Sequence, residues 1–283
     1  MNENLEATNS HVSADSANHR FAPPADFAAG AVADSALYTA AEADRLGFWA
    51  DQARQLHWHK PFDEVLDWSG APVARWFADG ELNVAYNCLD RHVIAGNGDR
   101  IALHWEGEPG DSRSLTYREL TAEVMRAANL LTSLGVVQGD RVAIYLPMIP
   151  EAVIAMLAVA RLGAIHSVVF GGFSAESLRA RIDDAGAKLV ITADGTWRKG
   201  KVSPLKPAVD AALDKGASTV EHLLVVRRAW SDEAVEAPLH YRLVGLEFTG
   251  ACVWVEGGYA SRWVPDSRGV LACSWNIHFE YYS

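Results

Sequence analysis

Three short apolar runs alternate with two helical patterns in the middle of the chain. The runs cover residues 141–146, 165–170 and 188–192, and each is rich in Val and Ile with little polar alternation. Such runs are typical of parallel strands that are buried on both faces of a sheet. We therefore expect three buried strands with helices packed between them.

Local signals mark where the two intervening helices begin and end. Pro150 suits the first turn of a helix, and the pattern that it opens ends near Gly163. The second helix is expected to begin at Ser174, a capping residue, and to end near Gly186. Strands and helices that alternate at this spacing predict a doubly wound α/β layer with right-handed crossovers.

Further elements are expected on both sides of this layer. The pattern Thr116-x-x-Glu119 predicts a capping box at the start of a helix that continues to Gly135. Two strands are expected before this helix, joined by a turn over 107–111. The expected strands are 101–105, 114–116 and 223–226, and the remaining expected helices are 40–56 and 207–213.

Composition changes at both ends of the chain. Residues 1–36 are rich in Ala, Ser, Asn and Asp, which predicts a disordered tail. Aromatic residues concentrate between positions 58 and 77, which predicts an arm held in place by ring burial. Beyond Arg228 helical periodicity fades and no Lys follows Lys215, so residues 229–283 are expected to form a divergent tail.

Charge and cysteine content narrow the class of partner. A net charge of −11 argues against nucleic acid or an anionic membrane, and no window approaches a transmembrane span. The three cysteines have no metal-like spacing and suit a reducing cytoplasm. His57 and His59 have no third ligand nearby, and no Ser-His-Asp set follows from the spacing, so we expect no metal-binding or catalytic residue. The oligomeric state stays open.

The loop after the second strand is one candidate binding segment, because ligands of doubly wound sheets bind beyond the carboxyl ends of the strands. Phe170 could stack on a planar ring, and Gly171 and Gly172 permit close approach of a ligand or tight packing of the loop. The segment is not a GxGxxG fingerprint, and the chain contains no Walker-type motif.

The loop after the third strand, residues 193–201, is the other candidate. Arg198, Lys199 and Lys201 place three cations within four residues, and Gly200 lets the backbone approach a ligand. Such a cluster suits a phosphate group, because hydrogen bonds from charged donors are strong. A solvated basic turn is the alternative interpretation, and composition alone does not separate the two.

Longer motifs resemble the N-terminal part of the acetate–CoA ligases, which are adenylate-forming enzymes. They are WFADGELNVAYNCLDRH at 76–92, LTYREL, GDRVAIYLPMIPEA, GAIHSVVFGGFS and VITAD. The resemblance covers residues 37–228 almost without a gap. It implies an arm of the acetyl-CoA synthetase type over 37–95 and the first part of an AMP-dependent synthetase/ligase domain over 96–228, in a truncated α/β protein with a mostly parallel sheet.

The resemblance also implies a coenzyme A site. In that family an Arg-x-x-Arg motif after VITAD binds the 3′-phosphate of coenzyme A, and here Arg198 matches its first position. Lys201 stands where the second Arg is usual; it keeps the charge but loses the planar fork. Phe170, Gly171 and Gly172 match a family segment that lies against the coenzyme's adenine.

The activity implied by the resemblance has two steps. Acetate and ATP, with Mg²⁺ on the phosphates, form acetyl-adenylate and diphosphate, and the thiol of coenzyme A then displaces AMP. The family's phosphate loop and catalytic lysine do not occur in these 283 residues, so we expect no acetate activation by this chain alone. A propionate- or acetoacetate-activating relative and a non-catalytic coenzyme A binder remain as alternatives.

The divergent tail prompts a separate hypothesis. Back-translation of residues 275–278, read two bases on, can spell Glu-His-Pro-Leu, a run that the family carries before its phosphate loop. We hypothesise that residues 229–283 are largely the product of a shifted reading frame. Sequencing the locus tests this, since an intact gene that encodes the tail in its normal frame would contradict it.

Overall fold

The computed structural model describes residues 22–214 and 218–229, and beyond these only the backbone of four short strands. The described residues fall into two compact units. The first contains the residues up to Gln55 together with Glu64–Ala78, and the second contains Leu56–Asp63 and the residues from Asp79 onward.

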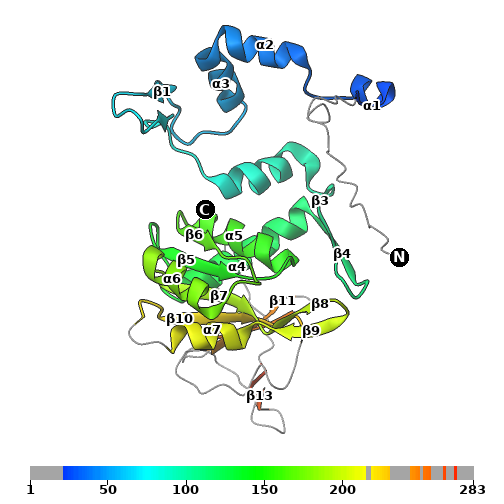
Figure 1. The fold of residues 1–283 in the computed structure, drawn as a ribbon, viewed down its shortest axis with the longest axis vertical. Coiled ribbons are helices and arrows are strands. Elements are labelled where there is room, and N and C mark those ends of the chain that lie inside the picture. Colours follow the sequence, from blue (N-terminus) through cyan, green and yellow to red (C-terminus); the bar gives the residue numbers. More distant parts are fainter. Residues whose placement is uncertain are drawn as a thin grey trace, which may run out of the picture. The chain divides into compact units, whose positions relative to one another are not determined.

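The first unit consists of short helices and a small hairpin, blue to cyan in Figure 1. Its helices are α1 (Ala25–Ala29), α2 (Ser35–Ala43) and α3 (Arg45–Arg54), and β1 (Leu66–Asp67) pairs with β2 (Arg75–Trp76).

The expected single helix over 40–56 is wrong, because the chain breaks at Asp44. This residue leaves helical geometry at φ −145° and accepts a hydrogen bond from the Gly47 N–H at 2.9 Å. A short carboxylate side chain that caps the next turn favours such a break.

The aromatic rings of this unit are less buried than expected. Trp49, Trp68 and Trp76 keep 47%, 53% and 39% of their surface exposed. Trp49 and Trp76 instead meet edge to face, with ring centroids 6.3 Å apart. Residues 1–21 lie outside the described part and α1 has no buried residue, so the disordered tail stays a prediction.

The second unit is built on one mixed sheet with the strand order β11-β12-β10-β7-β5-β6. Four neighbouring strands run parallel, as the apolar runs predict: β10, β7, β5 and β6. The strands of this sheet are β5 (Arg141–Tyr145), β6 (Ile165–Val168), β7 (Leu189–Ala193), β10 (His222–Val226), β11 (Leu243–Phe248) and β12 (Ala251–Val255).

The remaining elements connect or flank this sheet (Figure 1). They are the strands β3 (Ile101–Glu106), β4 (Ser112–Thr116), β8 (Gly195–Arg198), β9 (Lys201–Pro204), β13 (Val264–Pro265) and β14 (Leu271–Ala272), the π-helices η2 (Tyr86–Asp90) and η3 (Val93–Asn97), and the helices α4 (Tyr117–Ser133), α5 (Pro150–Arg161), α6 (Ala175–Ala185) and α7 (Lys206–Leu213).

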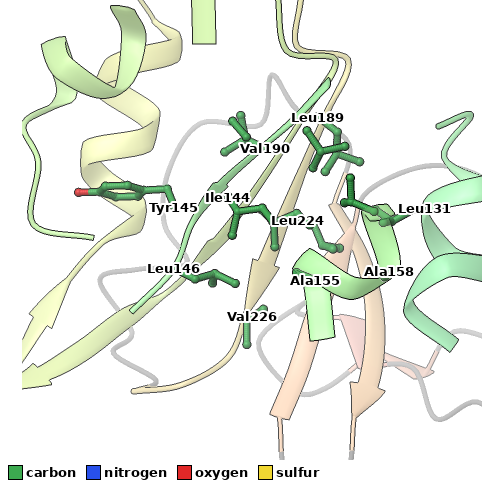
Figure 2. Packing of buried hydrophobic residues seen from close by; sticks show 14 of the residues in the cluster. Leu131, Ile144, Tyr145, Leu146, Ala155, Ala158, Leu189, Val190, Leu224 and Val226 are labelled. Carbon is green, nitrogen blue, oxygen red and sulfur yellow. The ribbon is translucent and has the colours of Figure 1, made fainter. Parts of the chain in front are cut away.

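The strand order explains why helices cover both faces of the sheet. From β5 the chain moves to β6 on one side and then returns past β5 to β7 and β10 on the other. Right-handed crossovers in opposite directions place their helices on opposite faces. In Figure 2, Leu131 of α4 and Ala155 and Ala158 of α5 lie on one side of the strands, while Tyr145 points to the other. The doubly wound α/β fold is therefore confirmed.

One strand departs from the expected burial on both faces. β5, β7 and β10 are almost completely buried, but Ile165 and Val168 of β6 are 56% and 53% exposed. In the described sheet β6 lies at one edge and has β5 as its single neighbour. An apolar run shows that a strand can be buried, but the position of the strand in the sheet determines how much of its surface is buried.

The predicted ends of the helices next to the sheet agree with the structure. Ser174 caps α6 by accepting a hydrogen bond from the Ser177 N–H, and Gly186 ends the helix in the left-handed region at φ 56°. Pro150 begins α5. Thr116 and Glu119 form the capping box of α4: the Thr116 hydroxyl accepts from the Glu119 N–H at 3.2 Å, and the Glu119 carboxylate accepts from the Thr116 N–H at 2.8 Å.

We expect Thr116→Ala to lower the free energy of unfolding by about 1 kcal/mol, because it leaves an N–H of the first turn of α4 without its acceptor. Thr116→Ser keeps the hydroxyl and should differ from the original protein by no more than a few tenths of a kcal/mol. Urea denaturation of both variants measures the difference. Equal stability of the two variants would show that the hydroxyl does not stabilise α4.

Candidate functional site

An open cleft of about 550 Å³ lies at the carboxyl ends of the parallel strands. Each strand contributes to the lining at its carboxyl end. The segments are 145–149 from the last residue of β5 onward, 170–173 after β6, the β8–β9 hairpin after β7 and Arg228 after β10. Residues 105–108 at the end of β3 complete the wall. Doubly wound sheets bind ligands at this position, near the strand from which successive strands are added in opposite directions, here β5.

The loops after β5 and β6 pack against each other along their backbones. A Cβ placed on Gly171 would lie 3.2 Å from the Leu146 carbonyl oxygen, so glycine allows this approach. The Tyr145 hydroxyl donates a 2.8 Å hydrogen bond to the Phe173 carbonyl oxygen. Burial raises the pKa of Tyr145, so the hydroxyl stays protonated and able to donate. Gly171 therefore serves tight loop packing.

Gly172 lies where the two predicted binding segments meet. A Cβ at this position would lie 2.9 Å from Cε1 of Phe170 and 3.8 Å from Nη1 of Arg198. Phe170 keeps 65% of its surface exposed, and its ring meets Phe173 edge to face at 6.0 Å. An exposed ring beside a guanidinium gives the cleft a flat apolar surface next to a positive charge.

The segment predicted as a loop over 193–201 is in fact mostly β-structure. β8 and β9 pair antiparallel from Gly195 with Pro204 to Arg198 with Lys201 and form the hairpin drawn in yellow in Figure 1. Lys199 and Gly200 make its two-residue turn with φ of 53° and 71°. Positive φ at both positions defines a turn that matches the twist of the flanking strands.

The side chain of Asp194 ties this hairpin to the end of β10. Its carboxylate accepts hydrogen bonds from the backbone N–H groups of Gly195 at 2.7 Å, Arg228 at 2.7 Å and Ala229 at 3.0 Å. Asp194 is only 5% exposed, so its carboxylate is shielded from water and depends on these three N–H groups for hydrogen bonds. The hairpin and the residues after β10 therefore share one buried anchor.

Trp105 and Arg228 form the opposite part of the lining. The Arg228 guanidinium lies 5.0 Å from the centroid of the Trp105 ring and forms an ion pair with Asp111 at 3.0 Å. The Trp105 indole N–H donates to the Met148 carbonyl oxygen at 2.7 Å. Contacts on both its face and its edge hold this ring in one orientation.

The sequence-predicted site residues are therefore brought together only in part. Phe170, Gly171, Gly172 and Arg198 line the cleft. Lys199, Gly200 and Lys201 lie at the exposed tip of the same hairpin and do not belong to the lining. Within the described part of the chain, the Arg198 side chain has no hydrogen bond or ion pair, which leaves its donors directed at no protein acceptor.

Sequence reasoning did not identify four residues of this site: Trp105, Glu108, Asp194 and Arg228. A signal existed for Asp194, since a carboxylate directly after a buried apolar run must find donors at the sheet edge. No comparable signal marks Trp105 and Arg228, which meet across more than a hundred positions of the chain.

The cleft offers aromatic surface and cations, which suit binding of a planar, anionic molecule. Among the described residues no group of three or more His, Cys, Asp and Glu side chains could hold a metal ion, so no Mg²⁺ site is assigned to them. The described helices also include none that combines the length and apolar character needed to cross a membrane.

Comparison with known families decides the class of protein. The model of the AMP-binding enzymes matches residues 90–242, more than half of the chain, and the model of the acetyl-coenzyme A synthetase N-terminus matches residues 35–88. The chain belongs to the AMP-binding enzyme family. The cleft lies entirely within the part that the AMP-binding model matches.

Similar members of this family are named acetyl-coenzyme A synthetase. The protein of Streptomyces avermitilis is 66% identical over 215 residues, which cover 76% of this chain and 33% of that protein. Those of Mycobacterium tuberculosis H37Rv and Gemmatimonas aurantiaca are 67% and 57% identical and are covered to 34% and 32% of their length, over 75% and 74% of this chain. The chain thus spans about a third of the length of these relatives. The resemblance to the acetate–CoA ligases is confirmed.

We expect Asp194→Ala to lower the free energy of unfolding by about 3 kcal/mol, because three backbone N–H groups lose a buried acceptor. Asp184→Ala removes the same charge from an exposed position near the end of α6 and should change stability by less than about 0.5 kcal/mol. Chemical denaturation of both variants gives the comparison. Similar losses in the two variants would show that Asp194 is not an anchor.

Proposed function

We propose that this chain is the coenzyme A-binding N-terminal portion of an acetate–CoA ligase. The whole enzyme would join acetate to coenzyme A through acetyl-adenylate and release AMP and diphosphate from ATP. The observation that supports this is one cleft that holds both the Phe170–Gly172 loop and Arg198 within a matched family region.

The two sides of the cleft suit two parts of one ligand. Phe170 presents an exposed ring on which adenine can stack, and Gly172 leaves room between this ring and Arg198. The Arg198 guanidinium, with Lys199 and Lys201 on the same hairpin, would bind the 3′-phosphate. Hydrogen bonds from charged donors to phosphate are short and strong. Among the described residues no protein acceptor competes with the phosphate for the Arg198 side chain.

Activation of acetate would need residues that these 283 residues do not include. ATP and Mg²⁺ are the substrates and metal implied for the whole enzyme, whereas the 283 residues contain no Pro-Lys-Gly phosphate loop. Our proposal therefore gives this chain binding of coenzyme A and no residue of the adenylation chemistry. Its partners would be small molecules, in the cytoplasm. No observation favours a propionate- or acetoacetate-activating relative.

Coenzyme A should bind the purified chain more tightly than dephospho-coenzyme A, which lacks the 3′-phosphate. We expect Arg198→Ala to weaken binding of coenzyme A by about tenfold or more, because a charge-assisted hydrogen bond is lost, and to leave dephospho-coenzyme A binding nearly unchanged. Calorimetric titration measures both ligands.

Two variants control this experiment. Lys60→Ala removes an exposed charge outside the cleft and should change neither affinity. Lys201→Arg restores the planar fork and should strengthen binding of coenzyme A alone. Equal affinity of the original chain for the two ligands would refute the phosphate assignment.

The purified chain should release no diphosphate when it is given acetate, ATP and Mg²⁺, because it carries no phosphate loop or catalytic lysine of the family. An enzyme-coupled diphosphate assay tests this, with an acetyl-coenzyme A synthetase of full length as the positive control. Diphosphate release that depends on both acetate and ATP would contradict the proposal that this chain carries no residue of the adenylation chemistry.

A further inference from the structure

The β8–β9 turn already binds an anion that belongs to the chain itself. The Gly200 backbone N–H donates a 2.5 Å hydrogen bond to Oε1 of Glu108, a residue 92 positions earlier, in the turn between β3 and β4. Glu108 also lines the cleft. The contact therefore joins the tip of the hairpin to the opposite rim of the cleft.

The geometry of the turn leaves this N–H group to an outside acceptor. The β8–β9 ladder closes with Arg198 opposite Lys201, so Gly200 lies in the turn and outside the ladder. Its φ is 71°, and a Cβ placed on it would meet no atom within 4 Å. Gly200 is therefore exposed at the tip of the hairpin, next in sequence to Lys199 and Lys201.

Glu108 and Gly200 are both exposed, so water and dissolved ions can compete for their hydrogen bond. In the described part of the chain, none of Arg198, Lys199 and Lys201 forms an ion pair with it. A single hydrogen bond from a backbone N–H to a charged carboxylate contributes about 1.5–3 kcal/mol. A phosphate, with more negative charge and three acceptor oxygens, can displace such a carboxylate.

We propose that the Gly200 N–H is a donor to the 3′-phosphate of coenzyme A and that Glu108 is its internal competitor. This inference rests on the proposed function, since it names a further donor and a specificity-determining carboxylate in the same site. In the free chain Glu108 occupies the donor. On binding, the phosphate replaces the carboxylate and Glu108 moves away from the hairpin.

The carboxylate then determines which ligands the site accepts. A ligand that ends in a 3′-hydroxyl gains little by displacing Glu108, whereas a 3′-phosphate gains the N–H and three neighbouring cations. Glu108 also repels the phosphate, because two negative charges approach the same donor. Its removal should therefore strengthen binding of the phosphorylated ligand and hardly affect the other.

The test measures affinities of the 283-residue chain for coenzyme A and dephospho-coenzyme A in Glu108→Gln and Glu108→Ala. Both variants remove the charge, and we expect coenzyme A to bind about fivefold more tightly, the size of one exposed like-charge repulsion. Dephospho-coenzyme A should bind within twofold of the original chain. Glu106→Gln is the matched control, because it removes the same charge from the same cleft without a hydrogen bond to the hairpin.

The outcomes separate the two proposals. If the original chain does not prefer coenzyme A over dephospho-coenzyme A, the proposed function fails and this inference fails with it. If the preference exists but Glu108→Gln weakens binding of coenzyme A, leaves it unchanged or acts no more than Glu106→Gln, only the competitor role fails. Glu108 is exposed, so thermal unfolding of the variants should match the original chain and show that they are folded.

Discussion

The carboxylate of Asp194 accepts hydrogen bonds from three backbone N–H groups that come from two segments of the chain. Gly195 begins the β8–β9 hairpin, and Arg228 and Ala229 follow β10. A buried carboxylate cannot remain without donors, so the two segments are held at one point where the sheet ends. The position of every cleft residue on the hairpin depends on this anchor, Arg198 included.

The same anchor connects the two walls of the cleft. Arg228, held at its backbone by Asp194, places its guanidinium on Trp105 and pairs with Asp111. On the hairpin side, Arg198 lies beside Gly172, and the Tyr145 hydroxyl donates to the carbonyl oxygen of the adjacent Phe173. The fixed backbone therefore brings cations and rings to one space, and the contact of Arg228 with Trp105 adds to this arrangement. This pre-organisation reduces the ordering that a ligand must impose.

Local signals carried most of the fold prediction, because caps and turns act within three or four residues. Ser174, Gly186 and the Thr116–Glu119 box marked helix ends correctly, and parallel topology placed the loops after β6 and β7 at the ligand-binding edge of the sheet. The hairpin and the exposure of β6 could not be predicted in this way, since both depend on neighbouring strands. The ion pair of Arg228 with Asp111 spans 117 positions and no local pattern announces it.

The most direct test of the account follows the backbone amides of Gly172 and Gly200 by NMR in the ¹⁵N-labelled chain during titration with each ligand. The account predicts that coenzyme A shifts both amide resonances, because the ligand spans the loop and the hairpin. Dephospho-coenzyme A should shift Gly172 and leave Gly200 bonded to Glu108. Identical shifts with both ligands, or shifts confined to residues outside the cleft, would contradict the account.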